Sequence, residues 1–473
     1  MPNRLNASAI GRLLGPAIFA VTALTDAPAG MPEQAWLVAG LVVWMASWWM
    51  TEAVPLTATA LLPFIVLPFS GVSNAKETAA SYYSPILFLI LGGAFVALAI
   101  ERTGLHRRLS LAILSFVGSD GGQTRLLLAF MISAAVLSML ISNTSTSLIM
   151  MPMALAVLAG GGLKEGSFDG LSGALPMGIA FAASIGGLGT LVGSPTNAIA
   201  VGLLDTMTGT QISFFEWSLY GLPIVIIGVP LAAWIVAKVQ KVEEHPFDVA
   251  SARNAIATQA KWSTPEKRLV PIVALTFLAW LTVPWVKEML PAGSWTNGTI
   301  AVLAGFALFL LPDGTGRPLL VWKEADRAPW GVIMMFGGGL ALAAGMQASG
   351  LADWLGEALL PLENLPLIVV ALAIVAMVVL ITEFASNVAT ASGIIPVVAA
   401  LIVALGADPI LLAMPAALAA SWGFMLPAGT GPNAIAWATG RIKIERMAGA
   451  GLILDVIGVF VIVGMVWAIA ALV

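Results

Sequence analysis

Two short groups of Ser, Asn and Thr residues interrupt apolar stretches of the chain, and their side chains have the chemistry to bind small ions. The first group is "SNTSTS", Ser142 to Ser147, and the second begins with "SNVAT" at Ser386. They align at an offset of 244 residues, which also pairs Ser138 with Thr382 one helical turn earlier. Hydroxyl and amide groups can donate hydrogen bonds to an anion, and their oxygens suit a hard monovalent cation such as sodium.

A second pair of related segments follows in the same order. "GSPTNAIA" spans Gly193 to Ala200, and "GTGPNAIA" spans Gly429 to Ala436. Glycine permits a sharp backbone course, and proline suits the first turn of the helix that follows. The sequence therefore predicts broken helices at 193–197 and 429–433, where free carbonyl oxygens become available to a small cation.

The composition predicts that these polar groups lie inside a membrane. The chain has 473 residues, of which 59% are hydrophobic and 10% charged, with a mean hydropathy of +0.97. Soluble domains carry about 25% charged residues, so we expect an all-α polytopic membrane protein. The absence of Cys excludes disulfides, thiol nucleophiles and cysteine metal sites, and two His residues argue against a histidine metal site. Nothing in the modest net charge indicates nucleic-acid binding.

The apolar windows are long enough for about 11 transmembrane helices. Two further stretches, 124–159 and 365–405, are cut in the middle by the polar groups, and each predicts a re-entrant hairpin. If each of these stretches formed two full spans in place of a hairpin, the orientation of every other span would be unchanged. The expected spans are 9–25, 34–51, 53–70, 84–102, 174–208, 218–238, 268–286, 297–312, 330–349, 410–440 and 449–472.

The distribution of basic residues predicts the orientation. With the N-terminus in the cytoplasm, all but two of the 21 Lys and Arg residues fall on the cytoplasmic side, Lys76 and Lys287 being the exceptions. The basic start, with Arg4 and Arg12, resembles a cleavable signal, but an anchor helix fits a polytopic chain better. We expect a multi-pass protein of a bacterial-type inner (plasma) membrane with lipid around it.

The two halves of the chain are predicted to be inverted copies. A third pair of segments, Gly92 to Leu105 and Gly338 to Leu351, shares the pattern of "GGAFVALAIERTGL" and "GGLALAAGMQASGL". Five spans separate the hairpins, so the second copy is upside down, as in many secondary transporters. The hairpin tips then meet near mid-membrane. Small polar residues often only pack helices together, but two clusters at one offset, each followed by a helix break, favour a transport site.

In these paired motifs the chain resembles the divalent anion/sodium symporter family, the dicarboxylate, citrate and sulfate carriers. The resemblance covers nearly the whole chain. It implies a homodimer whose protomers each have a scaffold and a mobile transport domain that moves like an elevator. The scaffold would comprise 1–118 and 246–361, each ending in an amphipathic arm helix from Gly104 or Gly350, and the transport domain 119–245 and 362–473.

The resemblance also implies ligands for each part of the site. One sodium ion would be held by Ser138, Ser142, Asn143 and the Gly193 region, and the second by Thr382, Ser386, Asn387 and Gly429. The substrate would meet Asn143, Thr144, Ser194, Pro195, Asn387, Val388 and Thr430. Two residues depart from the pattern of many relatives, because Val388 replaces a Thr and Gly431 replaces a Pro.

No Lys or Arg falls within the predicted site, so sodium ions and helix N-termini must offset the charge of the substrate. Glu383, beside Thr382, could tune the second cation site or carry a proton, or it could only hydrogen-bond nearby backbone to steady the hairpin.

The first hypothesis is sodium-coupled symport of di- or tricarboxylates, with C4-dicarboxylates favoured over citrate and then sulfate. The second is a sodium-independent exchanger, which the hydroxyls and amides at the cation sites disfavour. An intramembrane enzyme is the third, but the sequence has no HExxH, GxSxG or paired intramembrane aspartates, so we expect no enzyme.

Overall fold

The computed structural model describes residues 7–117, 122–163, 166–254 and 261–472. Within these ranges, helices are the only regular elements apart from one isolated bridge between Pro312 and Pro318. Arg4, Lys164 and the predicted domain boundary between 118 and 119 lie outside the described residues.

The chain begins with two long antiparallel helices, and the third expected span differs from the prediction. In place of one helix over 53–70 there are two short helices: the first begins only after Pro55, and Pro63 has no N–H to bond the Thr59 carbonyl at the junction with the second. A further short helix was not expected. The elements are α1 (Ala7–Leu24), α2 (Glu33–Thr51), α3 (Leu56–Thr59), α4 (Leu62–Phe69) and α5 (Ala75–Ser81).

The next part of the chain contains the first arm, the first hairpin and the first broken helix. A left-handed glycine, Gly104 at φ +82°, turns the chain from a long helix into the arm. The elements are α6 (Pro85–Thr103), the arm α7 (Leu105–Val117), the hairpin legs α8 (Gly122–Ser138) and α9 (Asn143–Gly160), the two parts of the broken helix, α10 (Leu171–Gly186) and α11 (Pro195–Thr208), and α12 (Phe214–Val239).

The second half of the chain repeats this order. The span expected over 268–286 bends by 63° near Thr282, ahead of Pro284. The elements are α13 (Val249–Asn254), α14 (Thr264–Leu281), α15 (Val283–Val286), α16 (Asn297–Leu310), α17 (Trp322–Ala325), α18 (Trp330–Ala348), the arm α19 (Leu351–Leu359), the hairpin legs α20 (Leu367–Thr382) and α21 (Asn387–Leu405), the broken helix α22 (Pro409–Ala419) and α23 (Gly431–Ala438), and α24 (Ile444–Ala470).

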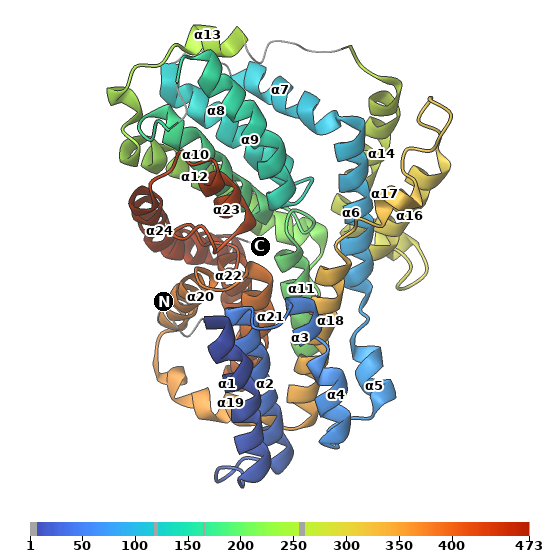
Figure 1. The fold of residues 1–473 in the computed structure, drawn as a ribbon. Helices are drawn as coiled ribbons and strands as arrows, with labels where there is room; N and C mark the ends of the chain where they lie inside the picture. The colour runs from blue at the N-terminus through green and yellow to red at the C-terminus, as the bar shows by residue number, and fades with distance from the viewer. Residues whose placement is uncertain (1–6, 118–121, 164–165, 255–260, 473) are drawn as a thin grey trace.

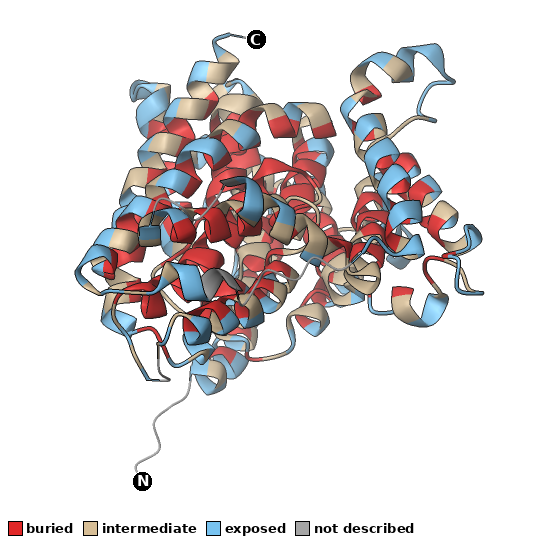
Figure 2. Ribbon diagram, turned by 90° about the horizontal axis from the view of Figure 1, so that it is seen from above, coloured by how far each residue is buried: buried red, intermediate tan, exposed pale blue. Residues whose placement is uncertain are grey.

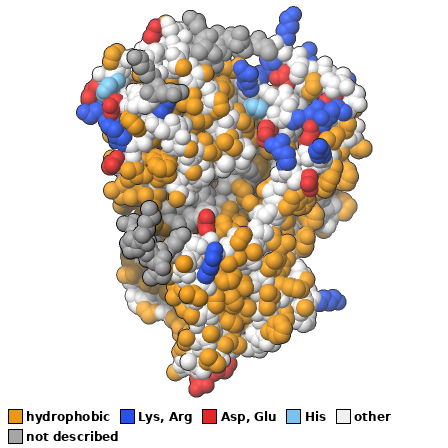
Figure 3. Space-filling model, in the orientation of Figure 1, with side chains coloured by type: hydrophobic (Ala, Val, Ile, Leu, Met, Phe, Trp, Pro, Cys, Tyr) orange, Lys and Arg blue, Asp and Glu red, His pale blue; other side chains and the backbone are white. Residues whose placement is uncertain are grey.

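The helices are suited to a bilayer in length and composition. Eight described helices are long and apolar enough to cross a membrane, or nine if the bent pair that begins with α14 is one span. The hairpin legs and broken helices are mostly shorter. Charged side chains gather over the upper part of the face in Figure 3, and hydrophobic side chains cover much of the rest. The prediction of an all-α polytopic membrane protein is confirmed.

The two arms lie at opposite ends of the molecule. In Figure 1, α7 lies at the top and α19 near the bottom. Gly350, at φ +78°, precedes α19 just as Gly104 precedes α7. The two long helices before the arms also pack alike, because Gly92 of α6 lies against Ala301 of α16 and Gly338 of α18 lies against Ala60. These paired features are those of an inverted repeat.

The two copies interlock at the centre. Helix α11 of the first copy packs along hairpin leg α21 of the second, and α23 of the second packs along hairpin leg α9 of the first. Figure 2, seen from above, shows buried residues mainly towards the inside of the molecule and exposed residues mainly around the outside. This crosswise packing brings both hairpin tips and both helix breaks to one place.

Candidate functional site

Four helices begin at the same cavity, and each begins with a hydroxyl residue that caps it. The side chains of Ser142 and Ser386 accept hydrogen bonds from the backbone N–H groups three residues later, both at 3.2 Å. Ser194 and Thr430 cap the two half-helices after the breaks, at 3.3 and 3.2 Å. Because the positive ends of the helix dipoles converge, the cavity favours negative charge.

The cavity has a volume of about 450 Å³. All seven residues predicted to contact the substrate line it, together with Ser142, Ser386 and Gly429 from the predicted cation sites. The other three predicted cation ligands, Ser138, Gly193 and Thr382, lie behind this surface. The lining residues predicted from the sequence are Ser142, Asn143, Thr144, Ser194, Pro195, Ser386, Asn387, Val388, Gly429 and Thr430.

Behind the first hairpin tip, the Asn143 amide is joined to the broken helix. It lies 2.7 Å from Ser138 Oγ, and in the orientation that satisfies its neighbours its nitrogen donates to the carbonyl oxygens of Ala183 and Gly193, at 3.2 and 3.1 Å. A Cβ atom at Gly193 would lie 2.5 Å from the Gly187 carbonyl oxygen and 2.9 Å from that of Ser138. A side chain at this position would therefore occupy a space bordered by carbonyl oxygens.

The second hairpin tip repeats this arrangement. Thr382 Oγ1 lies within hydrogen-bond distance of two acceptors, Asn387 Oδ1 at 2.9 Å and the Ala420 carbonyl oxygen at 2.8 Å. A Cβ atom at Gly429 would lie 3.2 Å from the Glu383 carbonyl oxygen and 3.6 Å from that of Thr382. Each tip thus has a glycine surrounded by carbonyl oxygens next to a hydroxyl and an amide.

The donor set at both places fits a small hard cation. Asn197 Nδ2 donates to the carbonyls of Gly187 and Thr190 at 2.7 and 2.8 Å, and Asn433 Nδ2 donates to that of Leu426 at 3.2 Å. The Oδ1 atoms of both asparagines are buried without a hydrogen-bond partner among the described residues. Buried oxygens need a partner, and oxygen-only ligands suit sodium better than a transition metal. The described residues contain no group of three or more His, Cys, Asp or Glu side chains able to hold a metal ion.

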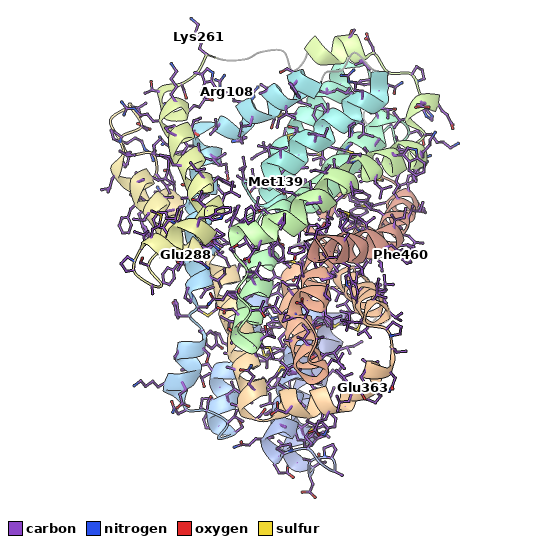
Figure 4. The ribbon with its side chains drawn as sticks, turned by 180° about the vertical axis from the view of Figure 1, so that it is seen from behind. Arg108, Met139, Lys261, Glu288, Glu363 and Phe460 are labelled. Atoms are coloured by element: carbon purple, nitrogen blue, oxygen red, sulfur yellow. The ribbon has the colours of Figure 1, made fainter. Side chains whose placement is uncertain are left out.

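The loops that carry the carbonyls are held differently in the two copies. In the first, Thr190 Oγ1 donates to the Met139 carbonyl at 2.7 Å and accepts from Gly193 N at 3.0 Å. Met139 lies near the centre of the molecule in Figure 4.

In the second copy, Glu383 occupies the position of Met139. Its buried carboxylate accepts the backbone N–H groups of Phe424, Met425 and Leu426 at 2.5 to 3.1 Å. These contacts agree with the expectation that Glu383 hydrogen-bonds nearby backbone and so steadies the hairpin.

One feature of the site differs from the expectation. The breaks begin earlier than 193 and 429, because regular α-helix ends at Gly186 and Ala419, and Asn197 and Asn433 lie within the helices that follow. Pro195 and Pro432 lie in the first turn of the new helices, as the sequence predicts, where a missing N–H has no cost.

Three other residues of the site could not be identified from the repeated motifs. Thr190 had no polar counterpart in the second repeat, so the repeat did not single it out. Glu101 and Arg327 line the mouth of the cavity and are the charged residues among its described lining. Glu101 lies within the paired segment Gly92 to Leu105 but has Gln347 as its counterpart, and Arg327 comes from a segment without a motif.

The comparisons with known proteins agree with this architecture. A family model for the sodium:sulfate symporter transmembrane region matches residues 6–473. The chain is 39% identical over 472 residues to the sodium-dependent dicarboxylate transporter SdcS of Staphylococcus saprophyticus, covering 97% of this chain and 90% of that protein. It is 37% identical to SdcS of Staphylococcus aureus strain MRSA252, covering 98% and 91%.

A solved structure shares the fold at low sequence identity. The YdaH transporter of Alcanivorax borkumensis aligns with a TM-score of 0.61 and 15% identity, covering 98% of this chain and 97% of that one. Since the family model covers almost the whole chain, and relatives above one-third identity cover nearly all of it, the protein belongs to the sodium:sulfate symporter family of membrane transport proteins.

Proposed function

We propose that this protein is a sodium-coupled symporter of dicarboxylate anions, with C4-dicarboxylates such as succinate as the favoured substrates. The main support is that four capped helix N-termini converge on one cavity. Behind each hairpin tip lies a cluster of oxygen atoms that could bind a cation. The names of the SdcS relatives support both the ion and the class of anion.

The chemistry of binding follows from charge. The carboxylates of the substrate would accept hydrogen bonds from the Asn387 amide and the Thr144 hydroxyl, while the helix N-termini face their negative charge. A dianion loses a large favourable hydration free energy when it leaves water, and hydrogen bonds from neutral donors offset this loss only in part. Sodium ions at the two clusters, near Gly193 and Gly429, supply the remaining positive charge. Substrate and sodium therefore bind together.

The movement we propose is an elevator motion of the transport domain (119–245 and 362–473) against the scaffold (1–118 and 246–361). The contact between these parts is rich in small residues: Gly202 of α11 packs against Phe336 of α18, and a Cβ at Gly339 would lie 3.3 Å from that of Ser392 in α21. Small residues leave a smooth surface for sliding.

The arms that would link the two parts are tied to the scaffold. Arg108 of α7 binds Glu266 of α14 at 2.9 Å and the Lys261 carbonyl at 3.1 Å, and Arg108 and Lys261 lie near each other at the top of Figure 4. The same helix α7 packs against hairpin leg α8. We further propose a homodimer in a bacterial-type inner membrane, with the N-terminus in the cytoplasm.

Uptake by proteoliposomes tests the proposed function. Radiolabelled succinate should accumulate when an inward sodium gradient is imposed and should not when choline replaces sodium. Unlabelled citrate and sulfate, added in excess, should compete less well than malate or fumarate. Equal uptake in choline would replace the symport proposal with an exchanger of the same fold, and strong competition by citrate or sulfate would shift the substrate class.

A further inference from the structure

The mouth of the cavity carries an ion pair that the transport site does not use. Arg327, just before α18, donates to Glu101 in the last turn of α6, with 2.9 Å between Nη2 and Oε1. Both residues line the same cavity as the hairpin tips. No other Lys, Arg, Asp or Glu is among the described residues of its lining.

Arg327 differs from the other arginines near it. Arg102 donates to the fully buried Asp313 and to the Leu319 carbonyl, and Arg317 binds Glu324. The side chain of Arg102 is 20% exposed, whereas that of Arg327 is 62% exposed. Exposed ion pairs are weak and readily exchange partners, so the guanidinium of Arg327 can turn to an anion at little cost.

We propose that Arg327 is an anion-capture residue. It binds one carboxylate of the substrate at the mouth of the cavity, before the substrate reaches the hairpin tips or after the substrate leaves them. Glu101 holds the guanidinium in place while no anion is present. The inference rests on the proposed function and extends it to a residue of the scaffold. A guanidinium binds a carboxylate through two parallel N–H groups, and a positive charge at a narrow entrance raises the local concentration of anions.

The two members of the pair should have opposite effects if the role is capture. Arg327→Gln removes the attracting charge and should raise the KM for succinate about 3- to 10-fold. Glu101→Gln removes a competitor and a repelling charge, so the KM should fall. An ion pair that only stabilised the fold would give the same loss of activity for both variants.

The measurement is the initial rate of radiolabelled succinate uptake into inside-out membrane vesicles at saturating sodium, because we expect this mouth to face the cytoplasm. Arg327→Lys should restore much of the affinity. In Arg327→Gln the KM should also depend less on ionic strength, adjusted with choline chloride, while half-saturation by sodium stays unchanged. Lys323→Gln is the matched control, since it removes the same charge from an exposed residue of α17 that does not line the cavity.

An unchanged KM in Arg327→Gln, or an equal rise in both pair variants, would overturn the capture role. Failure of the proposed function looks different, because wild-type uptake would then be independent of sodium or would not carry succinate. Sodium-dependent uptake by the wild type, with no effect of Arg327→Gln, would leave the symporter standing and remove only the capture residue.

Discussion

At the scale of single residues, the site depends on pairs of side chains that fix one another. A hydroxyl one turn before each hairpin tip orients the tip asparagine, Ser138 for Asn143 and Thr382 for Asn387, at 2.7 and 2.9 Å. The sequence offset of 244 predicted these pairs, because both repeats conserve the hydroxyl and the amide. The helix breaks predicted free carbonyl oxygens near Gly193 and Gly429 but not which residues supply them, since any residue has a carbonyl and only the backbone course decides where it points.

Replacing either tip asparagine should abolish transport without unfolding the protein. Asn143→Ala or Asn387→Ala removes a side chain that lines the cavity beside a proposed cation site, and hydrogen bonds to charged groups are worth about 1.5–3 kcal/mol each. We expect sodium-dependent succinate uptake to be abolished while the purified variants keep their elution profile in size-exclusion chromatography. Asn364→Ala, an exposed asparagine outside the site, should transport normally. Normal transport by either tip variant would count against the site.

Replacing Glu383 should weaken the binding of sodium more than the binding of substrate. Its carboxylate positions the loop 424–426, which precedes Gly429, so Glu383→Gln weakens several charge-assisted hydrogen bonds to backbone amides. Since such bonds contribute about 1.5–3 kcal/mol each, half-saturating sodium for succinate uptake should rise at least about tenfold. Glu363→Gln is the control, because Glu363 is exposed at the far end of the molecule in Figure 4. A sodium response identical to that of the wild type would show that the anchor does not position the cation site.

At the scale of elements, long apolar helices were predictable and short ones were not. Hydropathy located α1, α2, α6 and α24 within a few residues, because each has an apolar run of bilayer length. Short helices such as α5 are too brief to show a period, and they form from local caps: the Asn74 side chain accepts from Glu77 N at 2.9 Å. The arms were expected from the family resemblance, and the structure shows a left-handed glycine before each, Gly104 and Gly350.

The loop between α16 and α17 gives an element-scale prediction about pH. Burial alone would raise the pKa of Asp313, but hydrogen bonds from Arg102 and Thr315 outweigh it and hold the pKa well below its ordinary value. A carboxyl whose pKa is lowered by folding contributes stability above its unfolded pKa of about 3.9, and loses it as the pH falls below that value.

The Asp313→Asn variant should therefore melt at a lower temperature than the wild type from pH 8 to pH 5, and the difference should shrink below about pH 4. Thermal unfolding of the detergent-solubilised protein, followed by the intrinsic fluorescence of its tryptophans, measures both. Equal melting temperatures at neutral pH would mean that the ion pair with Arg102 does not hold this loop to α6.

At the scale of the whole molecule, inversion explains why neutral residues can bind an anion. Because α11 packs on α21 and α23 packs on α9, each copy completes the site of the other, and neither half holds a cavity with four helix N-termini by itself. The odd number of expected spans between the two hairpins predicted this inversion. The depth and mouth of the cavity, including Arg327, depend on how the halves pack together, which no local pattern in the sequence records.

We propose that sodium ions at the two inverted polar tips enable the dianion to bind. Equilibrium binding of succinate to the purified protein, measured by isothermal titration calorimetry in sodium or choline buffer at equal ionic strength, tests this dependence. We predict succinate binding in sodium, with an affinity that rises with sodium concentration, and no detectable binding in choline. Equal affinity in the two buffers would contradict the claim.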